Sequence, residues 1–319
     1  MNPLENQTVT LADGRILGYA EYGPADGFPV LYFHGYPSSR LEARPMERIA
    51  HRRGLRILAL DRPGYGLSTF QPGRRIVDWP QDVKEFAEKA GLKQFAVLGW
   101  SGGGPYAVAC AYRLPRSMLS AAGVMAGSAP WKAGVKGFPK TMRLIRLAVT
   151  YIPGVFKVVS GAIVGMLKWA ATSRLGTRVV DRSLKSRGNG TEDEQDDESM
   201  RPAPEQRERL FGLLFEGWAQ GTGAFVQEGQ LLTSQDWGFE FEDVAYDQLQ
   251  LWHGTKDTRV PLEKIRYLTE RLPHCTLKEY DGTGHADIVR HLEEILAELV
   301  PEGKFTERST TLQMASTAV

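Results

Sequence analysis

The segment GWSGGGP, Gly99 to Pro105, places a serine between glycines with the spacing G-x-S-x-G. A serine hydroxyl in this pattern can attack a carbonyl carbon when the chain turns sharply from a strand into a helix. The chain contains 34 glycines, so the pattern alone could arise by chance. The neighbouring sequence must therefore supply the turn and the partners that a nucleophilic Ser101 needs.

The residues around Ser101 have the composition that such a turn requires. The apolar run Phe95–Trp100 predicts a buried strand before it, and the small residues of GGPYAVACAYRL predict a helix after it. Glycines at Gly99 and Gly103 would remove side-chain collisions across the turn. The start of the helix would direct free amide groups toward the serine. This context favours a nucleophilic Ser101.

A serine nucleophile needs a general base, and the sequence offers six histidines. His285 lies in the loop DGTGH after the last predicted strand, and functional side chains gather at the carboxyl ends of parallel strands. We therefore expect His285 to be the base. His34 ends an earlier strand and is expected to fix the next loop by hydrogen bonding. The other four are interpreted as surface or packing residues: His51, His253, His274 and His291.

The carboxylate that orients the base is expected in the segment HGTKDTRVP, where Asp257 follows a predicted strand by three residues. Asp281, in the turn YDGTG, is the weaker alternative because its position suits a turn former. The loop GSAPW, which follows another predicted strand, contains no carboxylate. The chain order serine, aspartate, histidine is the one that accompanies this nucleophile motif.

Two backbone N–H groups are expected to stabilise the negative charge on the oxygen of the attacked carbonyl. One belongs to Gly102, directly after the nucleophile. The other belongs to Tyr36 in the loop HGYPSSR, because Gly35 lets that backbone approach closely and Pro37 stiffens the turn. Losing one such donor typically lowers the rate by about 10²–10³-fold.

Short apolar runs alternate with helical patterns on both sides of a long helical segment. Strands are expected at Val30–Gly35, Leu55–Asp61, Phe95–Trp100, Leu119–Gly127, Leu249–Gly254 and Cys275–Tyr280. This alternation indicates an α/β fold with a parallel sheet covered on both faces. We expect a core in two parts, residues 1–129 and 236–303, with a helical cap at 130–235 between them and a disordered tail at 304–319.

The composition is that of an ordinary folded protein, with 42% hydrophobic and 24% charged residues. The 39 basic and 38 acidic residues nearly cancel, which disfavours nucleic acid as a partner. Cys110 and Cys275 are too few for a disulfide framework or a cysteine-based metal site. The first residues lack the basic and apolar parts of a signal peptide, so a cytoplasmic protein is expected.

The most apolar segment, Leu147–Ala171, is interrupted by Pro153, Lys157 and Lys168. We interpret it as amphipathic helices that cover another part of the protein and not as a membrane span. Six of the seven residues 192–198 are acidic, which is typical of a solvated loop.

Five segments, in this order, resemble the α/β-hydrolase superfamily: HGYP, DRPGYGLS, GWSGGGP, HGTKD and GTGH. The resemblance covers roughly residues 8–129 and 236–300. It implies a mainly parallel eight-stranded sheet, a helical cap over the active site, and neither cofactor nor metal. The chain is similar to the soluble members with an inserted cap, which include esterases, lactonases, C–C bond hydrolases and proline iminopeptidases. A serine at the position of the nucleophile, Ser101, disfavours the epoxide hydrolases and haloalkane dehalogenases, which use an aspartate at that position.

The expected function is a serine hydrolase that cleaves an ester or lactone of a small hydrophobic substrate through an acyl-enzyme on Ser101. Apolar cap residues suggest such a substrate, although helix packing explains them equally well: Trp169, Phe211, Leu214, Phe215 and Trp218. The alternatives are a C–C bond hydrolase, an acyltransferase, an aminopeptidase that holds a substrate ammonium with Glu216 or Glu228, and a non-catalytic ligand receptor. A homodimer through the cap is compatible with the sequence.

Overall fold

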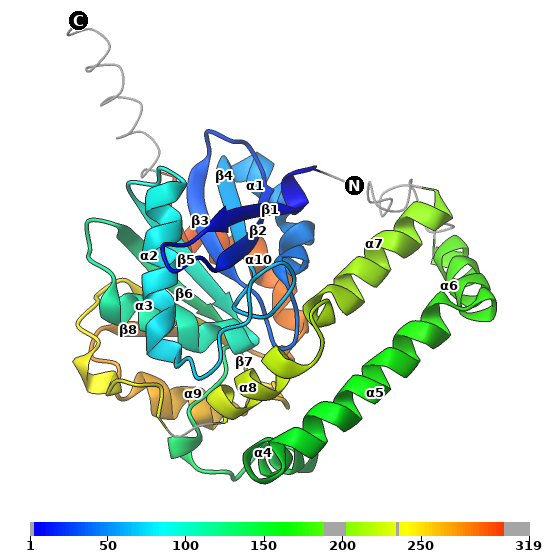
Figure 1. Ribbon diagram of the computed structural model, residues 1–319. Helices are drawn as coiled ribbons and strands as arrows, with labels where there is room; N and C mark the ends of the chain where they lie inside the picture. The colour runs from blue at the N-terminus through cyan, green and yellow to red at the C-terminus, as the bar shows by residue number, and fades with distance from the viewer. Residues whose placement is uncertain (1–2, 188–201, 234–235, 303–319) are drawn as a thin grey trace, which may run out of the picture.

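The computed structural model describes residues 3–187, 202–233 and 236–302, and these form an α/β fold around one sheet (Figure 1). The sheet has eight strands in the order β1-β2-β4-β3-β5-β6-β7-β8. Their bounds are β1 Gln7–Thr10, β2 Ile16–Tyr22, β3 Phe28–Phe33, β4 Leu55–Leu60, β5 Phe95–Trp100, β6 Leu119–Met125, β7 Leu249–Gly254 and β8 Cys275–Tyr280. The pairs β1–β2 and β2–β4 are antiparallel and the other pairs are parallel, which confirms the expected mainly parallel sheet.

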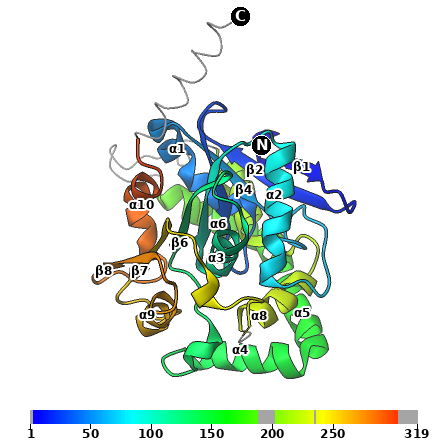
Figure 2. The same ribbon diagram turned by 90° about the vertical axis from the view of Figure 1, so that its left-hand side faces the viewer.

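Helices cover both faces of this sheet. The α-helices are α1 Glu47–Arg53, α2 Trp79–Lys89, α3 Gly104–Arg113, α4 Lys140–Tyr151, α5 Pro153–Thr172, α6 Arg174–Arg187, α7 Ala203–Phe215, α8 Gly223–Leu232, α9 Leu262–Thr269 and α10 Leu292–Leu299. Side chains of α2 and α3 belong to one hydrophobic core, and side chains of α1 and α10 belong to a second core. Figure 2 shows α1 and α10 on one side of the sheet and α2 on the other. Strands between two cores have no solvent-facing side, which explains why β3 is buried along its whole length.

The six strands expected from apolar runs are all present, within two residues at each end. The first two strands, β1 and β2, were not predicted individually, because their sequences QTVT and ILGYAEY mix polar and apolar residues as the edge of a sheet allows. The segment LEARPMERIAHRRG, between β3 and β4, does not form one continuous α-helix. Its first part, Arg40–Met46, is a 3-10 helix that contains Pro45, and α1 begins after it.

The segment between β6 and β7 is helical in its described part, which contains α4 to α8 and no strand. The interpretation of Leu147–Ala171 as helices that cover another part of the protein is wrong for α5, which has no buried residue. Both views place α5 at the outer edge of the molecule, away from the sheet (Figures 1 and 2). The acidic run 192–198 and the tail 304–319 lie outside the described residues.

Candidate active site

Ser101 lies directly after β5, in a short turn that leads into α3. Its φ angle is 50°, a left-handed conformation that a residue with a side chain rarely adopts. A Cβ atom at Gly99 would lie 2.3 Å from the carbonyl oxygen of Gly103, and one at Gly103 would lie 2.1 Å from the carbonyl oxygen of Phe33. Both positions therefore require glycine: Gly99 because of a collision across the turn, as expected from the sequence, and Gly103 because of a collision with the end of β3.

His285 lies between Ser101 and Asp257 and contacts both side chains. Its Nε2 is 2.9 Å from Ser101 Oγ, and its Nδ1 is 2.7 Å from Asp257 Oδ2. A carboxylate can only accept, so Nδ1 carries the proton and Nε2 is left to accept the serine O–H. The three residues come from the ends of β5, β7 and β8. The structure thus brings together the three residues predicted from separate segments of the sequence.

Asp257 is held by its own loop as well as by His285. Its Oδ1 accepts the backbone N–H groups of Arg259 at 2.8 Å and Val260 at 2.9 Å. Burial acts to raise the pKa of Asp257, but the bonds from His285 and Val260 outweigh it and keep the pKa below its usual value. Asp281, the alternative acid, is exposed and instead accepts a hydrogen bond from Thr255 at 3.0 Å.

A second histidine approaches the same carboxylate. His253 Nε2 lies 3.4 Å from Asp257 Oδ2 and 2.9 Å from the carbonyl oxygen of Val260. Burial lowers the pKa of His253, which favours its neutral form. The sequence assigned His253 to packing or local hydrogen bonding and gave no sign of its contact with the acid, because that contact depends on how the loop after β7 folds back.

The two expected oxyanion donors belong to loops that pack against each other. A Cβ atom at Gly102 would lie 2.6 Å from the Cβ atom of Tyr36 and 3.1 Å from its backbone nitrogen, so only a glycine allows this approach. The Tyr36 ring stacks on Phe225 of α8 with centroids 5.1 Å apart, and its hydroxyl donates to the carbonyl oxygen of Phe225 at 2.8 Å. Helix α8 therefore holds the Tyr36 side of this pair.

His34 is fully buried and is bonded within the loop that it was expected to fix. Its Nδ1 lies 2.8 Å from the Gly35 carbonyl oxygen, and its Nε2 accepts the backbone N–H of Arg62 at 3.2 Å. The guanidinium of Arg62 donates to the carbonyl oxygens of both His34 and Gly35. Burial and the nearby Arg62 charge hold the pKa of His34 well below its usual value, so it is neutral.

Arg62 connects this loop to α8 through a buried ion pair that the sequence did not reveal. Glu228 accepts from Arg62 Nε at 2.8 Å and from an Nη of Arg74 at 2.6 Å, and Arg74 also donates to the Tyr106 hydroxyl at 2.7 Å. Arg62 and Glu228 are both 0% exposed. The only signal for Arg62 was its place in the segment RPGYG, and nothing marked Glu228 as its partner.

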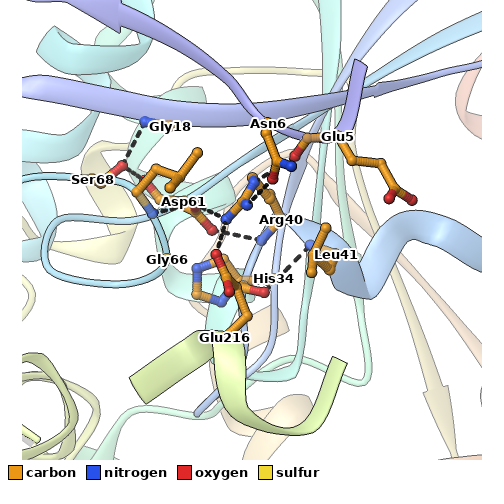
Figure 3. A network of polar contacts seen from close by, with 12 residues as sticks. Glu5, Asn6, Gly18, His34, Arg40, Leu41, Asp61, Gly66, Ser68 and Glu216 are labelled. Carbon is orange, nitrogen blue, oxygen red and sulfur yellow. Dashed lines mark hydrogen bonds and ion pairs between the residues drawn. The ribbon is translucent and has the colours of Figure 1, made fainter. Parts of the chain in front are cut away.

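A second buried arginine, Arg40, forms a similar network of polar contacts (Figure 3). Arg40 donates to Asp61 Oδ2 at 2.9 Å and to Glu216 Oε1 at 2.7 Å, and its Nε donates to the Glu5 carbonyl oxygen at 2.6 Å. Burial raises the pKa of Asp61 to about 6, and the Arg40 charge opposes a further rise. Glu216 follows α7, so the network joins the helical segment to the sheet.

These two networks decide what Glu216 and Glu228 can do. An aminopeptidase would need one of these carboxylates free to hold a substrate ammonium. Each instead forms an ion pair with a buried arginine at 2.7 Å or less. An arginine already supplies the positive charge that a substrate would bring, so neither carboxylate is available for that role.

A cavity of about 320 Å³ lies beside Trp100, the residue before the candidate nucleophile. Its lining is mainly apolar and consists of Tyr32, Ser38, Glu42, Pro45, Met46, Trp100, Met125, Leu213, Val289 and Leu292. Trp100 precedes Ser101, and its ring stacks on His285 with centroids 6.3 Å apart. Leu213 is the one lining residue from the helical segment, so none of the five apolar cap residues that suggested a hydrophobic substrate lines this cavity. Trp169 in particular is exposed on α5.

Glu42 is the one charged residue among those that line the cavity, and sequence reasoning missed it. Its Oε1 accepts the backbone N–H of Gly35 at 2.6 Å and the hydroxyl of Tyr32 at 2.9 Å. A Cβ atom at Gly35 would lie 3.2 Å from Glu42 Oε2 and 3.7 Å from Ser101 Cβ, so the carboxylate and the serine flank Gly35. Burial raises the pKa of Glu42 above its usual value.

Comparison with known proteins identifies a family. The sequence model of the alpha/beta hydrolase fold matches residues 29–292. A non-heme chloroperoxidase of Streptomyces lividans is 35% identical over 99 residues, which is 30% of this chain and 36% of that protein. A pimeloyl-[acyl-carrier protein] methyl ester esterase of Aromatoleum aromaticum is 37% identical over 76 residues, 23% of this chain and 30% of that protein. Each match thus spans only about a third of the relative's length.

A solved structure extends the likeness to nearly the whole chain. An esterase from Exiguobacterium antarcticum superimposes with a TM-score of 0.58 and 18% identity, covering 96% of this chain and 98% of that one. At this identity the likeness concerns the fold alone.

Proposed function

The chain belongs to the alpha/beta hydrolase family, and from this premise we propose that it is a serine hydrolase that cleaves a carboxylic ester or lactone. The observation that carries the proposal is the pair of contacts of His285, at 2.9 Å to Ser101 Oγ and 2.7 Å to Asp257 Oδ2. A serine in a strained turn with an oriented base beside it is the arrangement that nucleophilic catalysis needs.

The proposed reaction has two halves. In the first half, His285 Nε2 takes the proton of Ser101, and Oγ attacks the carbonyl carbon to form a tetrahedral intermediate. Its negative oxygen is stabilised by the N–H groups of Gly102 and Tyr36. The imidazolium returns its proton to the leaving oxygen, and the C–O bond breaks to give an acyl-enzyme. In the second half, a water activated by His285 releases the acid and restores Ser101.

The cavity beside Trp100 supports a small, hydrophobic substrate. Its volume of about 320 Å³ suits a small molecule, and its walls are mainly apolar. We assign this cavity to one side of the scissile bond. Glu42, at its edge, is assigned to holding Gly35 and hence the loop that carries the Tyr36 donor.

Hydrolysis of p-nitrophenyl esters of increasing acyl length by the wild type and Ser101→Ala tests the proposal. We expect the substitution to lower kcat by on the order of 10⁶-fold, since it removes the nucleophile. Ser128→Ala, which removes a hydroxyl from a neighbouring loop, serves as the matched control and should retain activity. A fluorophosphonate should label the wild type at Ser101. Hydrolysis that survives Ser101→Ala would sink the assignment of the nucleophile.

Three alternatives remain, and the products and the turnover rate separate them from the proposed function. The first two, an acyltransferase and a C–C bond hydrolase, would use the same three residues. An acyltransferase would pass the acyl group to an added alcohol in preference to water. A C–C bond hydrolase would turn over a β-diketone faster than any ester. A ligand receptor would bind small molecules with no appreciable turnover. Ester hydrolysis with water as the preferred acceptor distinguishes the proposed function from all three.

A further inference from the structure

Three consecutive helices present apolar side chains to the solvent. We name this segment, α4 to α6 or residues 140–187, the arm. Among its large apolar residues, Tyr151 is 76% exposed, Val158 is 71% exposed and Trp169 is 73% exposed. Single exposed apolar residues are common on protein surfaces, but a contiguous group of them marks an interaction site.

The apolar residues of α5 lie in a regular stripe. Val155, Val159, Ala162, Met166 and Trp169 are spaced by four, three, four and three residues, which places them on one face of the helix. All five are exposed. Such a stripe normally packs on the core of its own protein, and here the described residues provide no cover for it.

The arm is also strongly basic. Residues 140–187 contain ten lysines and arginines and a single acidic residue, Asp181. Asp181 pairs with Arg207 of α7 at 2.6 Å, so its charge is compensated from outside the arm. The rest of the chain holds 29 basic and 37 acidic residues. The net charge of +1 for the whole chain therefore conceals a separation of charge between the arm and the remainder.

We propose that the arm docks the protein onto the surface of an anionic lipid bilayer. Exposed apolar residues beside lysines and arginines are the combination that inserts into the boundary between headgroups and acyl chains. Each basic residue near an anionic surface contributes about 1 kcal/mol to binding. Trp169 has the side chain favoured at that depth. A second copy of this chain fits less well, because its arm would bring the same positive charge to the contact.

The arm lies on the bilayer and does not cross it. By length and composition alone, α5 could span a membrane, since it has 20 residues and contains an 18-residue stretch with a mean hydropathy of 1.4. Lys157 and Lys168, however, lie inside this helix. The carbonyl oxygen of Lys157 also accepts a hydrogen bond from Thr222 at 2.9 Å, and the Phe156 ring stacks on Phe225 at 5.7 Å. These contacts tie α5 to the start of α8 and so to the sheet.

Flotation of the purified full chain with vesicles tests the proposal. One vesicle is phosphatidylcholine alone, and the other contains phosphatidylglycerol as well. We expect binding to the second, little binding to the first, and release by molar salt, because exposed charges are screened. No binding to the anionic vesicles would overturn the proposal. Binding that resists both molar salt and alkaline extraction would also overturn it, in favour of a spanning helix.

Two variants of the arm and one control locate the contact. Lys168→Gln/Arg174→Gln/Arg178→Gln removes three charges and should weaken anionic binding by about 100-fold, at about 1 kcal/mol per charge. Val158→Ser/Met166→Ser/Trp169→Ser removes apolar contacts and should weaken it at least tenfold. Lys84→Gln/Lys89→Gln/Lys93→Gln removes three exposed charges outside the arm and should leave binding unchanged.

Folding and self-association are measured on the same samples. Thermal midpoints and p-nitrophenyl ester hydrolysis close to those of the wild type show that each variant is folded. Undiminished vesicle binding by both arm variants would contradict the proposal. A wild-type dimer in sedimentation velocity that dissociates in the serine variant, together with no vesicle binding, would identify the arm as a contact between two copies instead.

Discussion

Helices α3 and α5 are both apolar, and both begin with glycine and proline, yet they occupy opposite environments. In α3, eight of ten residues are buried between the sheet and its neighbours. In α5, none of 20 residues is buried. The difference does not arise from composition but from what each helix finds beside it. Helix α3 follows a central strand and must pack on the sheet. Helix α5 lies away from the sheet, at the outer edge of the molecule, and contacts α8 (Figure 1).

This comparison extends to charged groups. Around Ser101, ionisable residues are buried and each has a partner that fixes its position, as Asp257 has His285 and Glu228 has two arginines. In the arm, by contrast, six basic residues are exposed, and the segment has a single acidic residue, Asp181; the six are Lys140, Lys157, Lys168, Arg174, Arg178 and Arg182. Substitutions near Ser101 should therefore change activity or stability strongly, and substitutions in the arm should change mainly what the protein binds.

Among substitutions that leave the nucleophile in place, the largest effect is expected at Asp257. Asp257→Asn should lower kcat for p-nitrophenyl esters by about 10⁴-fold, because an amide no longer holds His285 in the tautomer that accepts the serine proton. Asp281→Asn is the matched control and should have little effect, since Asp281 contacts Thr255 at the surface. A reversed ranking of the two variants would move the role of the acid to Asp281.

A buried ion pair should give the next largest effect, on stability. Glu228→Gln leaves Arg62 and Arg74 buried without their counter-charge and should lower the free energy of unfolding by about 3–5 kcal/mol. Asp247→Asn removes an exposed partner of Arg116 and should change the free energy of unfolding far less, because solvent screens this pair. Urea titrations of both variants measure the difference. Equal costs would mean that burial does not distinguish the two pairs.

A smaller effect on catalysis is expected at Glu42. Glu42→Ala removes the acceptor of the Gly35 N–H and should lower kcat about tenfold, or ~1.4 kcal/mol in the barrier. Glu42→Gln keeps an oxygen acceptor and should restore most of kcat. A change confined to KM, with no rescue by glutamine, would instead make Glu42 a substrate-binding residue.

The smallest effect is expected for a glycine of the arm. Gly165→Ala places a methyl group in open space within α5 and should raise the free energy of unfolding by about 0.5–1 kcal/mol. In Gly103→Ala, near Ser101, the added Cβ atom would lie 2.1 Å from the Phe33 carbonyl oxygen. This variant should lose about 1–3 kcal/mol of its free energy of unfolding. Thermal unfolding followed by circular dichroism compares them, and a shift of the same sign in both would contradict the comparison.

Much of the fold and of the candidate site could be predicted because their signals are local. The strand Phe95–Trp100 was predicted with the bounds it has, since a buried parallel strand is a nearly continuous apolar run. Ser101, Asp257 and His285 were found because each follows a predicted strand, and parallel strands bring their carboxyl ends to one edge. The pairing of Glu228 with Arg62 could not be predicted, because the partners are 166 residues apart and their contact depends on how α8 docks.

The sequence by itself determined the turn at Ser101, the order of the strands along the chain and the excess of positive charge in residues 140–187. These follow from local sterics, hydrophobic pattern and counting. Only the tertiary structure decided that His253 approaches Asp257, that Glu42 and Ser101 flank Gly35, and that α5 has no buried residue. The physical reason is the same in each case. Whether a residue is buried or paired depends on both of the surfaces that meet, and a local sequence pattern describes only one of them.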